Sequence, residues 1–523
     1  MGNVYSIVQA PSDSFRRTLD RAFAIEIQNR QFAAQYSTWA KYDGRKHFYS
    51  TKTDAIPTGL LHILDKQLKN SGYEPIYVDK RVKPQLTISK VDLENPTLGE
   101  GSHKIQLRDY QIEAINIALQ NSRGIINMAV RSGKTEIMAS ICENIQPTKE
   151  CKGRVCILYN NVQLLRQTAN RIEQYLGEKV GMIFGGSWTE ERITCVGVQK
   201  FYKDFTSKNK MVKERAKKFL KSMDILLVDE CHRLQAKTWY TIAANCPAYY
   251  RYGFSGTPYS NNMLQSYSIV SMLGRTLYTI GSKELSDQGY TAEASFIIIN
   301  NPAKPPELKS YMQYEQHVQY GIIENYFRNN IIKNLAKKYG ALGKVLIIID
   351  RIEHGETLAQ ELDCDFIWGS HSIDYRERIF KEFDQGDKQL LIANKIVGEG
   401  INIKNIKYLI YAAGYKAYTR IIQHSGRALT KKEYGENNAV IIDFADTFSK
   451  YLSEHSEERI NIYKGTGYQV LYEDPYEYLD DSLLDLYKEH SRLKKDRFIQ
   501  NVDTSINDIE NKLSKLLNSD NRV

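Results

Sequence analysis

The sequence predicts an α/β protein with two tandem domains, each built on a parallel β-sheet, with a small α+β domain in front and a helical tail behind. The first observation is that apolar strand-like runs alternate with helical patterns in two successive blocks, at residues 107–289 and 294–446. Parallel strands need a crossover helix between them, so this alternation favours parallel sheets. The other two observations are a stretch of linker composition at 95–102 and a polar, helical pattern that begins near residue 449.

We therefore expect four parts. These are a small accessory domain at 1–98, a first α/β domain at 99–292, a second α/β domain at 293–448 and a helical extension at 449–523.

The predicted strands are short, mainly apolar runs between turn residues or polar residues. In the first block they cover residues 124–128, 155–159, 193–198, 225–228 and 251–255. In the second block they cover residues 345–349, 366–368, 390–393, 408–412 and 439–443. In the accessory domain the pattern predicts helices at 12–32 and 60–70.

Composition narrows the class of protein. A hydrophobic content of 42% and a charged content of 25% are ordinary for a globular chain. We find no apolar run of 18 or more residues, so no transmembrane helix is expected. Seven cysteines without a Cys-x-x-Cys pair favour reduced thiols and a cytoplasmic protein. The net charge of +9 favours a polyanionic partner.

The segment between the predicted strand at 124–128 and the helical pattern from Glu136 has the composition of a phosphate-binding loop. Gly133 allows close approach of the backbone, Lys134 supplies a cation for phosphates, and the Thr135 hydroxyl can bind magnesium. The full phosphate-loop pattern is incomplete, because Met128 stands where its first glycine would be. We expect ATP to be bound by Arg131, Ser132, Gly133, Lys134 and Thr135.

A second piece of the same site follows the apolar run at 225–228, where Asp229 and Glu230 are adjacent. Ligands of α/β proteins bind at the carboxyl ends of buried strands, so the pair is more than a solvated strand end. We expect Asp229 to hold Mg²⁺ and Glu230 to orient and deprotonate the attacking water.

Upstream, Gln111 precedes an amphipathic helix and could contact adenine, whose edge offers one acceptor and one donor.

Taken together, these segments resemble the superfamily 2 helicases and translocases, whose fold is two tandem RecA-like domains. The resemblance covers roughly residues 105–445. Its motifs I, II, III, V and VI correspond to Lys134-Thr135, Asp229-Glu-Cys-His232, Ser255-Gly-Thr-Pro258, Glu399-Gly-Ile-Asn402 and Gln423-His-Ser-Gly-Arg427. The segments 158–167 and 196–199 stand where the nucleic-acid motifs Ia and Ib belong.

The resemblance implies roles that the residues alone do not establish. Gly400 and Gln423 would help to bind ATP, and Arg427 would stabilise charge on the transferred phosphoryl group. By itself Arg427 is more often a surface arginine. Coupling of the nucleotide to movement would involve His232, Ser255 and Thr257. Contacts to DNA would involve Gln167, Gln199, Lys200 and Arg45.

A closer likeness is to the UvsW-type phage recombination helicases, which unwind and migrate branched DNA. Their small N-terminal domain has short motifs matched here by Trp39, Asp43-Gly-Arg45, Pro57-Thr-Gly-Leu60 and Gly72-Tyr73. The resemblance implies an ATP- and Mg²⁺-dependent helicase for branched or forked DNA and single-stranded/duplex junctions in recombination and repair. Its accessory domain would bind DNA. It would work in the cytoplasm, or in the host cytoplasm if the chain is phage-encoded.

The sequence differs from the superfamily's motifs at two positions, and these differences leave alternative functions open. Arg131 stands where most of the superfamily has glycine, and Thr430 replaces the second arginine of motif VI. The neighbouring lysines lack the guanidinium fork, so a weakly hydrolysing nucleic-acid-binding module is one alternative. A duplex DNA translocase of a restriction-type system is another. An RNA helicase is disfavoured, because Ser255-Gly-Thr-Pro258 differs from the Ser-Ala-Thr of DEAD-box proteins.

Two further segments carry weaker expectations. Residues 200–221 are rich in lysine and arginine and predict a basic helix, either along the DNA path or simply solvated. An apolar stripe at 3- and 4-residue spacing runs through Val502, Ile506, Ile509, Leu513 and Leu516. That helix would dock on its own core or mediate self-association.

Overall fold

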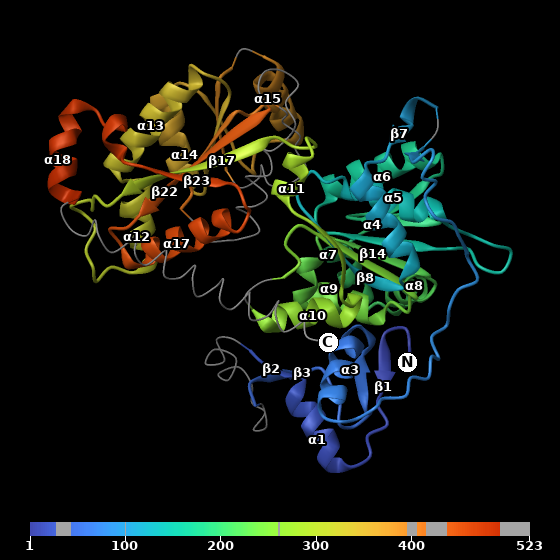
Figure 1. Ribbon diagram of the computed structural model, residues 1–523. Coiled ribbons are helices and arrows are strands. Elements are labelled where there is room, and N and C mark those ends of the chain that lie inside the picture. Colours follow the sequence, from blue (N-terminus) through green and yellow to red (C-terminus); the bar gives the residue numbers. More distant parts are fainter. Residues whose placement is uncertain are drawn as a thin grey trace. The chain divides into compact units, whose positions relative to one another are not determined.

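The computed structural model describes residues 1–27, 43–99, 101–259, 262–386, 388–394, 405–414 and 437–491. The chain divides into two compact units, Met1–Ile280 and Gly281–Val523. Figure 1 shows both units, with a parallel sheet and covering helices in each. The two predicted RecA-like α/β domains are therefore confirmed.

The first unit is built on an eight-stranded sheet of order β12-β11-β13-β10-β14-β15-β8-β16. Every neighbouring pair is parallel except β11 and β12. The strands are β8 (Arg123–Met128), β10 (Val155–Tyr159), β11 (Val180–Phe184), β12 (Ser187–Trp188), β13 (Ile193–Gly197), β14 (Ile225–Asp229), β15 (Tyr250–Ser255) and β16 (Thr276–Ile280). The helices are α4 (Asp109–Gln120), α5 (Lys134–Asn144), α6 (Val162–Leu176), α7 (Val198–Phe205), α8 (Lys210–Lys221), α9 (Lys237–Asn245), α10 (Met263–Leu273) and, at the start of the second unit, α11 (Ser282–Asp287).

The five strands predicted in the first block are confirmed to within one residue at each end. The prediction missed three strands of this sheet, the two-residue β12 and also β11 and β16, which have weaker local signals. Strand β16 is an edge strand whose residues are mostly half-exposed, and β11 carries a glycine in its second position. The predicted basic helix at 200–221 is wrong as a single element. It is two helices, because the Asn209 side chain caps the start of α8 by accepting from the amides of Met211 and Val212.

The second unit contains a seven-stranded, wholly parallel sheet of order β19-β20-β18-β21-β22-β17-β23. Its strands are β17 (Glu293–Asn301), β18 (Val345–Ile349), β19 (Asp365–Ile367), β20 (Leu390–Asn394), β21 (Tyr408–Tyr411), β22 (Asn438–Asp446) and β23 (Gln469–Glu473). Its other described helices are α12 (Tyr314–Val318), α13 (Tyr326–Gly340), α14 (Ile352–Leu362), α15 (Ile373–Gln385), α17 (Lys450–Lys464) and α18 (Asp481–Ser491).

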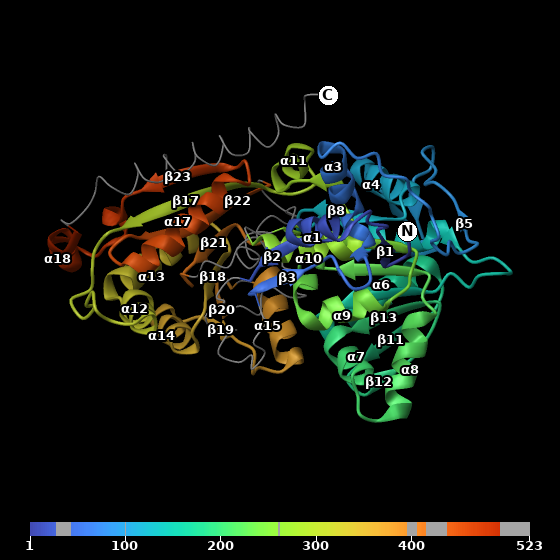
Figure 2. The same ribbon diagram turned by 90° about the horizontal axis from the view of Figure 1, so that it is seen from below.

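The described part of the tail, residues 449–491, is mainly helical as expected, and it also contributes a strand. Strand β23 pairs in parallel with β17 and forms one edge of the second sheet, as Figure 2 shows. Most of its residues are exposed or half-exposed, so its sequence lacks the apolar run by which the other strands were predicted. Residues 449–491 therefore form part of the second unit's own fold.

The accessory segment forms two small antiparallel ladders, β1 (Tyr5–Ile7) with β4 (Ala55–Pro57) and β2 (Ala24–Glu26) with β3 (Arg45–His47). Helix α3 (Leu61–Asn70) confirms the prediction at 60–70. The predicted helix at 12–32 is wrong at residues 23–27, while residues 28–32 lie outside the described part of the chain. Helix α1 (Asp13–Ala22) ends at Ala22, because the next residues pair with β3.

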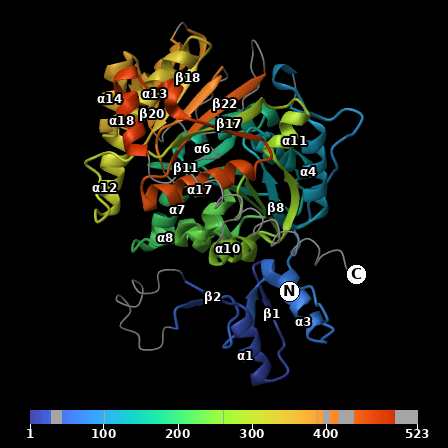
Figure 3. The same ribbon diagram turned by 60° about the vertical axis from the view of Figure 1, so that its left-hand side comes forward.

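Helix α10 lies between the accessory segment and the first sheet (Figure 3). Buried residues from both sides form one hydrophobic core, which includes Ile56 and Leu64 of the accessory segment and Trp239 and Ile269 of the first α/β domain. The accessory segment is therefore packed on the first sheet's covering helices. No helix in the described part of the chain is long and apolar enough to cross a membrane.

Candidate functional site

The nucleotide-site residues predicted from separate segments meet at one edge of the first sheet. Strand β15 lies between β14 and β8, and all three are parallel. Their carboxyl ends therefore lie together, and they carry Asp229, Ser255 and the loop that follows Met128. Ligand sites in α/β proteins form at this edge of the sheet.

The loop between β8 and α5 has a backbone suited to anion binding. Gly133 caps α5 in the left-handed region at φ 81°, and Arg131 is also left-handed at φ 71°. Successive left-handed turns before a helix point backbone amides toward a shared centre, and the helix dipole favours negative charge there. Lys134 and Thr135 then form the first turn of α5.

The predicted adenine ligand, Gln111, is engaged with this loop. Its Nε2 donates to the Ser132 carbonyl at 3.0 Å, and its Oε1 accepts from the Arg108 amide at 2.9 Å. The Tyr110 hydroxyl donates to the same Ser132 carbonyl at 2.8 Å. A Cβ at position 133 would lie 2.2 Å from the Gln111 Nε2, so only glycine fits there. Gln111 therefore holds the loop, and a contact to adenine stays a prediction.

The loop contains polar atoms that suit a polyphosphate. The Ser132 hydroxyl is fully buried and has no hydrogen-bond partner among the described residues. The Lys134 Nζ reaches only a weak contact, 3.3 Å from the Met128 carbonyl. A buried hydroxyl without a partner is costly unless a ligand or water satisfies it. The residues present therefore fit a triphosphate.

The pKa values of the two adjacent carboxyl groups, Asp229 and Glu230, are shifted in opposite directions. Burial and the negative charge of Glu230 raise the pKa of Asp229 above its ordinary value. Burial opposes ionisation of Glu230 as well, but the contact from His232 and the charge of Lys134 lower the net pKa of that carboxyl. A buried and a half-buried acid beside one lysine favour a divalent cation, which would offset the mutual repulsion of the two carboxylates.

A series of polar contacts connects Glu230 to the residues at the end of β15. The His232 Nδ1 lies 3.2 Å from a Glu230 carboxylate oxygen and 3.2 Å from the Ser255 hydroxyl. The Ser255 hydroxyl in turn accepts from the Thr257 amide at 3.1 Å. The three predicted coupling residues are thus brought together, and His232 is in direct contact with Glu230, the residue expected to activate water.

Sequence reasoning missed two contributors to the site. Tyr110 supports the loop through the Ser132 carbonyl, and its position beside Gln111 was the available signal. The positive charge of Arg233 lowers the pKa of both Asp229 and Glu230. Its place directly after motif II could have suggested this.

The predicted DNA contacts are spread over three elements. Gln167 is exposed on α6, and the Gln199 amide on α7 donates to the Asn160 side chain at 3.1 Å. Lys200 forms an ion pair with Asp204, and Arg45 on β3 lies 3.4 Å from Glu26. Both cations therefore have acidic partners in this structure.

Several predicted residues lie outside the described part of the chain. They are Trp39, Gly400, Gln423, Arg427, Thr430 and the apolar stripe at 502–516.

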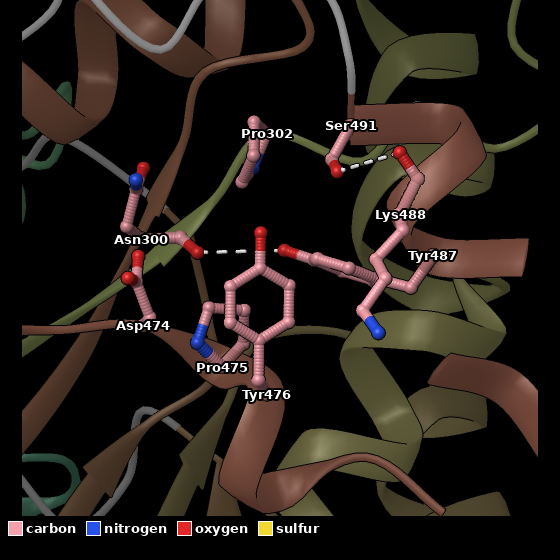
Figure 4. Close-up of a pocket in the computed structure, with 8 residues that line it drawn as sticks. All are labelled: Asn300, Pro302, Asp474, Pro475, Tyr476, Tyr487, Lys488 and Ser491. Carbon is pink, nitrogen blue, oxygen red and sulfur yellow. Dashed lines mark hydrogen bonds between the residues drawn. The ribbon is translucent and has the colours of Figure 1, made fainter. Parts of the chain in front are cut away.

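The second unit has a separate cavity of about 380 Å³ at the ends of β17 and β23. Figure 4 shows the eight residues that line it, among them Tyr487, whose hydroxyl lies 3.4 Å from the Asn300 carbonyl oxygen. The other lining residues are Pro302, Asp474, Pro475, Tyr476, Lys488 and Ser491. None of the predicted site residues lines it.

Two family models match the chain in tandem. Residues 104–260 match the res subunit of type III restriction enzymes, and residues 328–431 match the helicase conserved C-terminal domain. The first match spans the loop, the acid pair and Ser255, and the second spans the segment that contains Arg427.

Individual relatives agree with these matches. The chain is 22% identical over 481 residues to the ATP-dependent DNA helicase uvsW of Enterobacteria phage T4, which covers 84% of this chain and 92% of the phage protein. It is 22% identical over 369 residues to the DNA 3'-5' translocase XPB2 of Sulfurisphaera tokodaii, covering 63% of this chain and 80% of that protein.

Among solved structures, a fragment of a type I restriction enzyme HsdR subunit from Vibrio vulnificus has the same fold, with a TM-score of 0.53 at 17% identity. That match covers 83% of this chain and 78% of the fragment. Both matched domains occur in this order in superfamily 2 helicases, and the chain belongs to that superfamily of ATP-hydrolysing enzymes.

Proposed function

We propose that this superfamily 2 helicase unwinds or migrates branched and forked DNA in recombination, replication-fork processing and repair. The observation that carries the proposal is the meeting of the phosphate loop, the acid pair and Ser255 at one sheet edge. Similarity to a phage DNA helicase along 84% of the chain supports DNA as the partner. Action in the cytoplasm, or in a host cytoplasm, stays a prediction.

The proposed roles in hydrolysis follow from the position of each group. Lys134 and the loop amides hold phosphates, while Thr135 and Asp229 hold Mg²⁺. Bound ATP with Mg²⁺ supplies the phosphoanhydride bond and a charge that neutralises the buried carboxylates. Glu230 would orient the attacking water and take its proton, and its lowered pKa keeps the carboxylate ionised for that role. Arg427 would stabilise charge from the second unit.

His232 and Ser255 would couple a change in the protonation or position of Glu230 to the residues at the end of β15. Because His232 contacts both side chains through one nitrogen, a change at Glu230 alters the hydrogen bond between His232 and Ser255. This is the basis on which we assign coupling to His232, Ser255 and Thr257.

DNA would be held mostly through its phosphates. Such contacts are independent of sequence and weaken with salt, as expected for a chain of net charge +9. We propose that Gln167, Gln199, Lys200 and Arg45 take part, with Lys200 and Arg45 exchanging their acidic partners for phosphate.

The test is steady-state ATPase activity without nucleic acid and with single-stranded DNA, linear duplex, a four-way junction and RNA. Lys134→Ala is the control, and it should remove hydrolysis because it removes the loop's lysine. Strongest stimulation by the junction supports the proposal. Strongest stimulation by linear duplex supports the restriction-type translocase instead. ATP turnover no higher than that of Lys134→Ala with each of these nucleic acids would contradict the helicase proposal. It would support the alternative of a weakly hydrolysing nucleic-acid-binding module.

A further inference from the structure

The accessory segment contains a groove of about 780 Å³, which none of the proposed site residues lines. Strand β1 forms one wall, the irregular segment 73–78 forms another, and helix α3 also lines it (β1 and α3 are labelled in Figure 3). Of the twenty large apolar side chains that are exposed in the described part of the chain, six line this groove. They are Tyr5, Ile7, Tyr73, Ile76, Tyr77 and Val78. An exposed apolar cluster of this kind marks an interaction site.

The outer edge of β1 is unpaired. Among the described residues β1 pairs only with β4, and the Val8 amide, which follows β1, donates to the Asp54 carbonyl at 2.8 Å. Backbone groups of successive strand residues point to opposite sides, so the amide and carbonyl of Ile7 point away from β4. They have no hydrogen-bond partner in the described part of the chain. Gly2 lies against the Tyr5 carbonyl, since a Cβ there would be 2.4 Å from its oxygen. The open edge therefore begins at Ile7.

The second wall of the groove is held at both ends. At one end the Tyr73 amide donates to the Leu68 carbonyl of α3 at 3.0 Å. At the other end the Val78 carbonyl accepts from the Met1 nitrogen at 2.6 Å. Between these contacts the Ile76 side chain is 93% exposed and faces no covering element. The groove is therefore preformed, and a ligand would bind without the cost of ordering its walls.

The chemistry of the groove favours a peptide over a nucleic acid. The two charged side chains that line it, Glu74 and Lys80, have opposite signs, so the groove offers little attraction to a phosphate backbone. The apolar floor includes Leu61, Leu64 and Leu68 of α3. An unpaired strand edge beside an apolar floor is the arrangement that binds an extended peptide by strand addition.

We propose that this groove binds an extended apolar segment of a partner protein, which adds as a strand to β1. The peptide backbone would pair with Ile7, and every second side chain would face the leucines of α3. A strand of about five residues, the usual length, would suffice. The proposal gives the accessory segment a protein-docking role in addition to the DNA contact expected from the sequence, and it does not depend on the hydrolytic site.

The probe is a random octapeptide library displayed on bacteriophage and selected on the immobilised full chain. We expect enrichment of peptides with apolar residues at every second position. An enriched peptide is then synthesised with a fluorophore, and its affinity is measured by anisotropy. Ile76→Asp should weaken binding about 10-fold or more, because it places a charge in the apolar wall. Leu93→Asp is the matched control, at a residue that is 73% exposed and does not line the groove, and it should bind like wild type.

Methylation of the peptide's backbone amides tests strand pairing separately from apolar contact. It keeps every side chain and removes hydrogen-bond donors. Methylating the alternate amides that face β1 should weaken binding about 10-fold or more, whereas methylating the other set should have a smaller effect. Urea midpoints of Ile76→Asp and Leu93→Asp should equal that of wild type, because both side chains are exposed, so a loss of binding is not a loss of folding.

Three results would overturn the inference. The first is a library from which no peptide binds wild type more tightly than it binds Ile76→Asp. The second is equal binding of the two methylated peptides and the unmodified one, which would exclude strand addition. The third is a wild-type dimer, seen by sedimentation equilibrium, that Ile76→Asp converts to a monomer. That result would assign the groove to a second copy of this chain.

Discussion

At the scale of single residues, Asp229 and Glu230 show how neighbouring carboxyls acquire different properties. Both are enclosed at the end of β14, yet only Glu230 contacts His232. Burial raises the pKa of Asp229, while contact with His232 and the nearby lysine lowers that of Glu230. A magnesium ligand and a base for water can therefore occupy consecutive positions.

Glu230→Gln tests the assignment of the base. The amide keeps the shape of the side chain and cannot accept a proton, so hydrolysis should fall about 100-fold or more. ATP binding should remain, because Lys134 and the loop are intact. Single-turnover hydrolysis and nucleotide binding are measured on the same protein. A variant with the wild-type rate would show that another group activates water.

A pH-dependent prediction concerns His354 in α14 of the second unit. The ring is 1% exposed, and its Nε2 lies 2.9 Å from the Asn329 Oδ1. Since the Asn329 amide nitrogen donates to the Ile323 carbonyl, its oxygen is the acceptor and the histidine donates. Burial, with a smaller effect from the charge of Arg328, lowers the pKa of His354 to about 3.

A lowered histidine pKa stabilises the fold above the ordinary value of 6.5 and loses that stability as pH falls toward about 3. At pH 5 the loss should reach about 2 kcal/mol, at about 1.4 kcal/mol per pH unit. His354→Gln should flatten this dependence, measured by urea unfolding at pH 7 and pH 5. His103→Gln, at an exposed position, is the control. Equal pH dependence in wild type and His354→Gln would contradict the prediction.

At the scale of elements, the accessory segment meets α10 through very close backbone packing. Gly59 follows β4, and a Cβ there would lie 2.1 Å from the Val270 carbonyl oxygen and 2.6 Å from that of Ser271. Neither atom can move without bending α10. The contact therefore needs glycine, and it fixes the accessory segment against the helix.

Gly59→Ala should destabilise the first unit by roughly 1–3 kcal/mol, the usual cost of overpacking a closed contact. Urea unfolding of the full chain measures it. Gly186→Ala is the matched control, because a Cβ there would meet no atom within 4 Å. An unchanged midpoint for Gly59→Ala would mean that the accessory segment does not pack on α10 as described.

At the scale of the whole molecule, each unit has a hydrophobic core of its own. The core that joins the accessory segment to the first sheet uses residues up to Leu273, and the described cores of the second unit begin at Ala294. Each unit therefore has the core it needs to fold separately, and the catalytic role proposed for Arg427 would require the second unit.

A fragment of residues 1–280 should consequently bind ATP and fail to hydrolyse it. Binding should be lost in the same fragment with Lys134→Ala, which confirms that the loop is responsible. Fluorescent-nucleotide titration and steady-state ATPase assays measure the two properties. Hydrolysis by the fragment at the full-length rate would exclude a catalytic role for Arg427.

Much of the fold was predictable because its signals are local. Strands such as β10 and β14 are short, fully apolar runs, and they alternate with helical patterns. Lys134, Asp229 and Glu230 could be predicted as site residues because their chemistry and order are visible in the sequence. The apolar stripe at 502–516 and motif VI lie outside the described residues, and their roles stay predictions.

The sequence by itself determined the parallel α/β class and the positions of the main strands along the chain, and it is the basis for the proposed phosphate loop and acid pair. Only the tertiary structure decided that β23 completes the second sheet, that Gln111 holds the loop and that His232 joins Glu230 to Ser255. Periodicity and residue type are local signals, because each can be recognised within a few neighbouring residues of the sequence. Strand partners, buried charges and pKa values depend on groups brought together across long stretches of chain.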